Sequence, residues 1–222
     1  MTMALLLAAL AGYAVGSISF ARLVGRATAP GRSLDRATLS FHQGEEVEVV
    51  GVSATSVSMQ SGRRWGLLVS ALDIAKAALV TAVFRLVAPD EPAYLVAAAF
   101  VVIGHIWPIW HGLRGGFGVS PMLGGLLVVD PVALLVCIPL GLVIGLVTAD
   151  RLIVYDGWTL LLVPWFLLVR NDPAAAVYAI SVVSLYWWAM RVEVRSHIRR
   201  ARAGPRDWRS PVADVRMGYT GH

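Results

Sequence analysis

Two short segments of this chain combine side chains and backbone that suit the handling of an anion. Residues 104–108 (Gly-His-Ile-Trp-Pro) are followed closely by residues 114–118 (Arg-Gly-Gly-Phe-Gly), between long apolar stretches. Glycines let the backbone approach a ligand closely and let amide N–H groups converge on an anion. An ionisable residue at a membrane boundary is costly and is therefore a functional candidate. The two segments predict a site for a phosphate-sized anion at a bilayer surface.

The candidate residues of these segments differ in the chemistry they offer. Arg114 offers a bidentate contact to a phosphate. Gly115, Gly116 and Gly118 offer backbone amides at the start of a helix, where anions bind well. His105 is a candidate for activating a hydroxyl, with a structural histidine bonded to a backbone carbonyl as the alternative.

Three polar residues earlier in the chain lie within apolar stretches. Asp73 and Lys76, the only lysine, are three positions apart and share a helix face. They are interpreted as a structural ion pair, with direct substrate contact as the alternative. Ser17 ends the first apolar stretch, where its hydroxyl either bonds to a helix carbonyl or lines a headgroup site.

The elements that must position these residues are membrane helices. Hydrophobic residues make up 57% of the chain, charged residues 15%, and the mean hydropathy is +0.68, whereas a soluble domain carries about 25% charged residues. The apolar N-terminus lacks a positive region and is interpreted as a first span rather than a cleaved signal. The single cysteine, Cys137, excludes a disulfide within the chain and indicates a buried structural thiol.

Apolar runs separated by short polar breaks predict seven membrane spans. They cover approximately residues 3–23, 65–88, 93–112, 117–129, 131–149, 152–169 and 174–191. Asp130 and Pro131 divide the fourth span from the fifth, because proline disfavours continuation of a helix. The predicted fold is an all-α helix bundle in the cell membrane.

Arginines set the expected orientation. The loop at 24–64 and the tail after Met190 are rich in arginine and are expected in the cytoplasm, with the N-terminus outside. Residues 1–191 are expected to form one membrane domain, and residues 192–222 a tail that attracts anionic lipids. Residues 44–58 fit a short strand or hairpin, and equally a re-entrant segment. Nothing suggests a folded basic surface for nucleic acid.

Four segments resemble, in order and spacing, the bacterial acyl-phosphate glycerol-3-phosphate acyltransferases, which are integral membrane enzymes with seven spans. Residues 16–20 (Gly-Ser-Ile-Ser-Phe) resemble that family's Gly-Ser-Ile-Pro-Phe. Residues 54–76, with Ala-Thr-Ser-Val and Asp-Ile-Ala-Lys, resemble its Ala-Thr-Asn-Val and Asp-x-x-Lys. Residues 104–119 resemble its Gly-His-x-Phe-Pro and Lys-Gly-Gly-Lys-Gly-Val, and residues 198–204 resemble its C-terminal signature.

The resemblance implies transfer of an acyl group from acyl-phosphate to glycerol 3-phosphate, which yields lysophosphatidic acid for phospholipid synthesis. It implies no metal, no other cofactor, and no acyl-CoA or acyl carrier protein. It adds Ser56 to His105 as a catalytic candidate. It adds Thr55 and the nearby Arg63 to Ser17, Arg114 and the glycines as substrate-binding candidates.

The chain departs from the family pattern at several polar positions. Apolar residues stand where the family has a serine, an arginine, a lysine and a histidine: Val49, Met59, Phe117 and Val194. The basic residues that are candidates to compensate are Arg63, Arg64, Arg114, Arg151 and His197. These departures favour a second hypothesis, a catalytically degenerate relative that binds lipid or an unknown membrane protein. A small transporter is a third hypothesis, which no inverted repeat supports.

Overall fold

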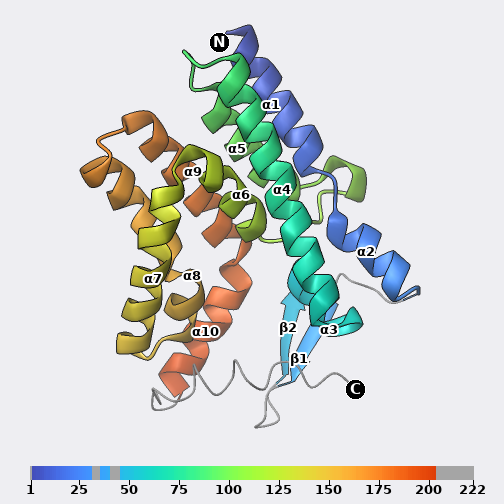
Figure 1. Cartoon of the computed structure of the whole chain (residues 1–222). Coiled ribbons are helices and arrows are strands. Elements are labelled where there is room, and N and C mark those ends of the chain that lie inside the picture. The colour runs from blue at the N-terminus through green and yellow to red at the C-terminus, as the bar shows by residue number, and fades with distance from the viewer. Residues whose placement is uncertain (1, 32–35, 41–45, 204–222) are drawn as a thin grey trace. The chain divides into compact units, whose positions relative to one another are not determined.

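The computed structural model describes residues 2–31, 36–40 and 46–203, and the chain divides between Val129 and Asp130 into two compact units (Figure 1). The first unit contains α1 (Met3–Gly16), α2 (Phe20–Thr28), β1 (Arg36–Ser40), β2 (Glu46–Val50), α3 (Ala54–Ser61), α4 (Arg63–Val87), α5 (Ala93–Ile106), the 3-10 turn η1 (Ile109–His111) and α6 (Val119–Val129). The second unit contains α7 (Pro131–Thr148), α8 (Arg151–Pro164), the π-helical turn η2 (Trp165–Val169), α9 (Pro173–Ala189) and α10 (Arg191–Ala203).

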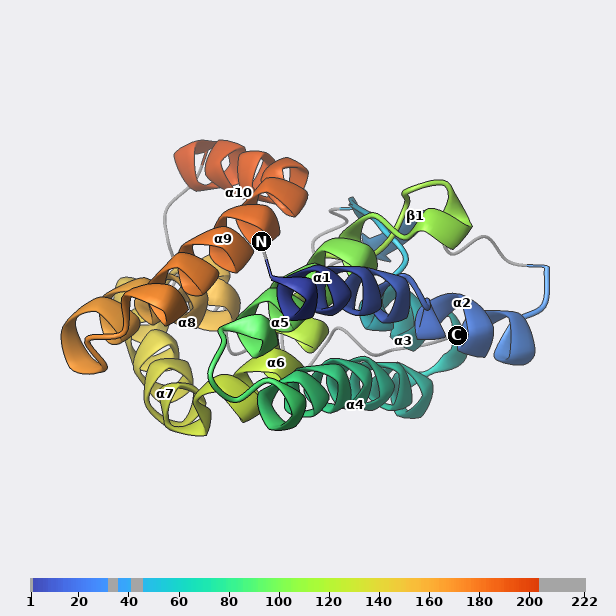
Figure 2. The same cartoon turned by 90° about the horizontal axis from the view of Figure 1, so that it is seen from above.

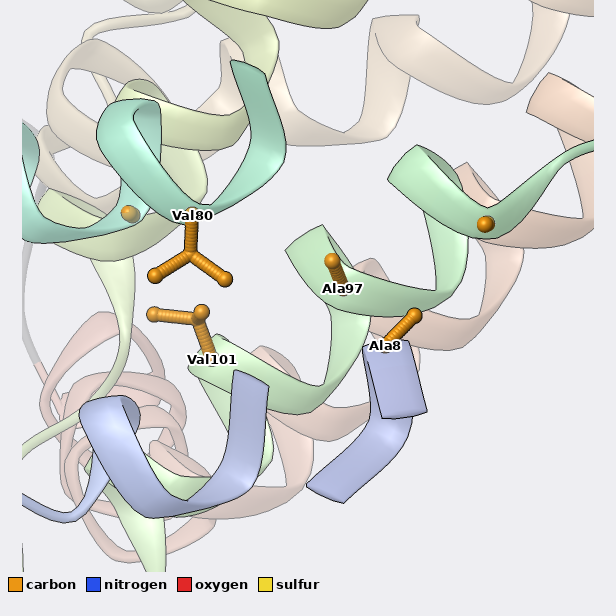
Figure 3. Close-up of a cluster of buried hydrophobic side chains, with 6 residues drawn as sticks. Ala8, Val80, Ala97 and Val101 are labelled. Atoms are coloured by element: carbon orange, nitrogen blue, oxygen red, sulfur yellow. The ribbon is translucent and has the colours of Figure 1, made fainter. Parts of the chain in front are cut away.

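Helices α1, α4 and α5 lie side by side in the first unit and hold its apolar core (Figures 1 and 2). Small residues permit the close approach of α1 and α5, since a Cβ added at Gly12 would lie 2.6 Å from Ala97 O. In the core, Val80 of α4 faces Val101 of α5, with Ala8 of α1 and Ala97 beside them (Figure 3). This packing fixes α5, which ends at the candidate site.

The first predicted span is broken near its C-terminal end. The segment between Gly16 and Phe20 separates α1 from α2, which continues to Thr28 rather than ending near residue 23. Ser19 begins α2, because its side chain accepts a hydrogen bond from the backbone N–H of Arg22. The break leaves the carbonyls of Gly16 and Ile18 without partners within a helix. The Lys76 ammonium, described below, donates to both.

The long polar loop contains both kinds of regular structure. Strands β1 and β2 pair antiparallel, with Arg36 opposite Val50 and Ser40 opposite Glu46. Helix α3 follows, and the alternatives for residues 44–58 therefore resolve into a strand from residue 46 and a helix from residue 54. In the described residues these are the only strands, and the membrane part of the fold is all-α as predicted.

In the second unit, α7 packs tightly against α8. A Cβ added at Gly141 would lie 2.5 Å from Trp158 N, and one at Gly145 would lie 2.3 Å from Val154 N. The two glycines are four residues apart and face one helix, which is the small-residue spacing of closely packed membrane helices. Helix α9 packs on α8, where the Trp187 indole N–H donates to Thr159 Oγ1 at 3.0 Å.

The predicted break at Asp130 and Pro131 is present. Helix α6 ends at Val129, and the Asp130 carboxylate caps α7 by accepting the amide N–H groups of Val132 and Ala133. Arg170 donates to the same carboxylate at 2.5 and 2.7 Å. Burial alone raises the pKa of Asp130, but the bonds from Arg170 and Trp165 outweigh burial and hold that pKa below its usual value. Arg170 is thus the ion-pair partner of a helix cap.

The helices account for most of the predicted spans. Among the described residues, five helices are long and apolar enough to cross a membrane, and α9 with α10, bent by 63°, brings the number to six. Helix α6 has 11 residues, about 17 Å at 1.5 Å per residue, which is short of the roughly 30 Å apolar layer. The count of seven spans and the orientation of the termini remain predictions.

Candidate functional site

Residues 114–118, here called the glycine turn, fold back onto the end of α5. Gly115 N donates to Ile106 O at 3.1 Å, and Gly116 N donates to His105 O at 3.2 Å. A Cβ added at Gly115 would lie only 1.9 Å from His105 O, so no other residue fits there without movement. The two amides expected to bind an anion are therefore already engaged within the protein, which corrects that part of the sequence interpretation.

The open amides lie slightly later in the chain, at the start of α6. The first backbone bond of α6 runs from Met122 N to Gly118 O at 3.0 Å, so the N–H groups just before it have no partner within the helix. Gly118 adopts φ +98° and packs against Val102 and Ile106, so it shapes the entry to α6. An unsatisfied helix N-terminus carries partial positive charge and favours an anion.

A second helix N-terminus adjoins the same turn. Val52 N donates to Gly115 O at 3.2 Å, which attaches the entry of α3 to the glycine turn. Thr55, in the first turn of α3, is exposed. The starts of α3 and α6 thus flank Gly115 and Gly116 from two different parts of the sequence.

His105 lies between the glycine turn and a buried ion pair. Its Nδ1 is 3.5 Å from Asp73 Oδ1 and 3.5 Å from Lys76 Nζ. Its Nε2 faces Gly116, where an added Cβ would come within 2.5 Å of that nitrogen. The imidazole is therefore held on one side by charges and presents its other nitrogen to the turn.

The Lys76 side chain makes its contacts inside the protein. Its ammonium lies 2.7 Å from Asp73 Oδ1 and donates to Gly16 O at 3.1 Å and to Ile18 O at 2.7 Å. The ammonium thus lies among one carboxylate and two backbone carbonyls. Lys76 therefore satisfies the carbonyls left open by the break between α1 and α2, and the pair of Asp73 and Lys76 is structural in its geometry.

The hydroxyls of Ser17 and Ser56 are also used internally. Ser17 is 0% exposed; its Oγ donates to Tyr13 O at 2.8 Å and accepts from Ile109 N at 3.3 Å. Ser56 is 0% exposed and forms a capping box with Ser53, the N-cap of α3. These contacts give both serines positioning roles, and Ser17 makes the bond to a helix carbonyl that was one of its two expected alternatives. Substrate contact by Ser17 and catalysis by Ser56 stay predictions.

The arginines are distributed unevenly around the turn. Arg114 is exposed in the turn itself, and Arg63 is exposed at the start of α4. Arg22 was not among the sequence candidates, yet its Nη2 donates to Arg114 O at 3.0 Å. No spacing within one helix could have found that contact, because 92 positions separate the two residues.

The remaining candidates lie elsewhere or outside the described side chains. Phe117 packs near Gly51, and Met59 is half-buried in α3. Val49 lies in β2, whose side chains are outside the described residues. Arg151 and Val194, like His197, belong to the second unit.

The second unit holds its own polar contact near the start of α8. Asp150 caps α8 and lies 3.1 Å from His197 Nε2 of α10. Burial alone raises the pKa of Asp150, but the bond to His197 and the amides of Ile153 and Leu152 outweigh burial and lower that pKa below its usual value. Among the described residues, no group of three or more His, Cys, Asp or Glu side chains is arranged to hold a metal ion.

Comparison with known proteins identifies the family. A family model described as glycerol-3-phosphate acyltransferase matches residues 6–204. A glycerol-3-phosphate acyltransferase of Rhizobium etli is 30% identical over 205 residues, which cover 90% of this chain and 88% of the relative. The relatives are acyltransferases and give no support to the non-catalytic hypothesis.

Solved structures show the same fold. The glycerol 3-phosphate form of PlsY (YgiH), an integral membrane glycerol 3-phosphate acyltransferase, aligns with a TM-score of 0.73 and 22% identity over 94% of this chain and 98% of that one. Its lysophosphatidic acid form aligns with a TM-score of 0.71 and 21% identity over 88% of this chain and 92% of that one. The chain is therefore a multi-pass integral membrane protein of the bacterial cell membrane. It belongs to the glycerol-3-phosphate acyltransferase family.

Proposed function

We propose that this protein transfers an acyl group from an acyl-phosphate to the 1-hydroxyl of glycerol 3-phosphate. The observation that carries the proposal is the placement of His105 Nε2 against Gly116, between two helix N-termini. Both substrates are phosphate monoesters or acyl phosphates, so each brings negative charge that helix N-termini and arginines favour. The chemistry needs neither a metal nor another cofactor.

The reaction forms one ester bond and breaks one acyl-phosphate bond. The hydroxyl oxygen of glycerol 3-phosphate attacks the acyl carbonyl carbon, and inorganic phosphate leaves with the electron pair of the broken bond. His105 is assigned as the group that accepts the hydroxyl proton, since Nε2 faces the turn and Nδ1 faces Asp73. Arg114, with Thr55 and Arg63 as further contacts, is assigned to the substrate phosphates.

The basic face of α10 supports a role for anionic lipids. Arg191, Arg195 and Arg199 are four residues apart along the helix and exposed, and Val192 and Ile198 are exposed beside them. This mixture of arginine and apolar side chains suits a helix lying at the headgroup level. Turnover in liposomes with and without phosphatidylglycerol tests the inference: the charge reversal Arg195→Glu should weaken only the phosphatidylglycerol-dependent part of the activity.

The decisive experiment is turnover by purified protein in liposomes, with palmitoyl-phosphate and glycerol 3-phosphate as substrates and lysophosphatidic acid as the readout. His105→Ala is expected to lower kcat by about 100-fold or more, the usual loss for a general base. Arg114→Ala is expected to raise KM. Arg85→Gln, at the opposite end of α4 from Arg63, is the matched control for removing an arginine outside the site. Wild-type protein that forms no product beside an active family enzyme refutes the proposal.

A further inference from the structure

Arg22 occupies a fixed position at the edge of the glycine turn. Its backbone N–H is held by Ser19 Oγ at 3.3 Å, at the start of α2. The preceding residue, Ala21, is 2% exposed and packs with Val52 and Val57 in a buried cluster. Because both contacts set the rotation of α2, the half-buried Arg22 side chain leaves the helix in a defined direction.

That direction brings the guanidinium to the turn. Its Nη2 donates to Arg114 O at 3.0 Å, immediately before Gly115. A guanidinium is always charged, and it presents its N–H donors in a planar fork that suits a phosphate. Arg22 therefore adds positive charge to a turn already flanked by the N-termini of α3 and α6.

The charge balance around the turn favours a phosphate over a neutral ligand. Arg114 is exposed beside Arg22, and the carboxylate of Asp73 is neutralised by Lys76 at 2.7 Å. A phosphate monoester carries up to two negative charges and accepts bidentate contacts from arginine. A planar fork at the turn matches that geometry.

We propose that Arg22 is a binding residue for the phosphate group of one of the two substrates, held in place by its bond to Arg114 O. The proposal rests on the acyl transfer proposed above. It names the shared chemistry, a phosphate, which both glycerol 3-phosphate and the acyl-phosphate carry. Kinetics with each substrate varied in turn distinguishes the two sources.

Arg22→Gln is the informative variant, because glutamine removes the charge but keeps an amide donor for Arg114 O. We expect KM for one substrate to rise about 10-fold to 100-fold, the loss that follows from removing a charge-assisted bond, with a much smaller change in kcat. Arg22→Lys keeps the charge and should recover most of the affinity. Arg26→Gln, one turn later on α2 and exposed, is the matched control and should leave both KM values unchanged.

Unchanged KM values for both substrates in Arg22→Gln would overturn the proposal, as would equal effects in Arg26→Gln. Protection against thermal unfolding by glycerol 3-phosphate, palmitoyl-phosphate and inorganic phosphate supplies a second readout. If the wild-type protein binds a phosphate without turnover, acyl transfer fails while the binding assignment survives, provided that Arg22→Gln abolishes the protection. Protection that is identical in wild type and Arg22→Gln refutes the assignment regardless of activity.

Discussion

Replacing Lys76 with methionine tests whether the ion pair holds the candidate site together. The ammonium lies 2.7 Å from Asp73 Oδ1, and the two side chains are 5% and 2% exposed. Methionine fills similar volume but leaves a buried carboxylate without its countercharge. Breaking a buried pair in this way costs about 3–5 kcal/mol of unfolding free energy. The carbonyls of Gly16 and Ile18 lose their donor in the same variant.

A double-mutant cycle separates the charge from the carbonyl contacts. The variants are Lys76→Met, Asp73→Asn and the double substitution, with unfolding free energies measured by denaturant titration in detergent micelles. We expect the double variant to lose at least about 2 kcal/mol less unfolding free energy than the two single losses added together. The reason is that neither charge remains buried alone in the double variant. Arg85→Met, at the exposed end of the same helix, is the control for losing a cation from α4. Single losses that add to within about 0.5 kcal/mol would refute the reasoning.

Two further predictions concern the glycine turn and the second unit. Gly116→Ala should abolish most turnover with little loss of fold, because the new Cβ would come within 2.5 Å of His105 Nε2. The control is Gly112→Asn, which should retain activity because position 112 has open space and a left-handed backbone that asparagine tolerates. Equal activity in both variants would contradict the expectation. Asp150→Asn should cost about 1 kcal/mol of unfolding free energy at pH 7, since the pKa of Asp150 is lowered by His197 despite its burial. A carboxylate whose pKa is lowered in the folded state contributes its full stability above the unfolded pKa of about 4 and loses it as the pH falls through the folded pKa. The difference in unfolding free energy between wild type and Asp150→Asn should therefore shrink as the pH is lowered below about 4, and a difference that stays constant over that range would count against this origin.

The first unit also explains why an ionisable cluster is tolerable among apolar helices. Asp73 and Lys76 balance each other, and the lysine caps carbonyls that the break between α1 and α2 would otherwise leave unsatisfied. In an apolar layer, backbone irregularity is stable only where another group satisfies it. The break and the ion pair are therefore one structural feature, and its consequence is a fixed position for His105.

The sequence by itself determined what depends on local order along the chain. Composition determined the membrane class, and the residue types of Asp130 and Pro131 determined the break between α6 and α7. The three-residue spacing of Asp73 and Lys76 determined that they share a face, because residues three apart are always neighbours on the surface of a helix. Motif order also indicated the family that the comparisons identify.

Tertiary structure alone decided which polar groups remain available for a substrate. The amides of Gly115 and Gly116 donate to backbone carbonyls at the end of α5, and the hydroxyl of Ser56 takes part in its capping box. Arg22 joins the turn only because α2 packs on α3 and brings it to Arg114. Hydrogen-bond partners distant in sequence depend on the packing of whole helices, and no local spacing encodes that packing.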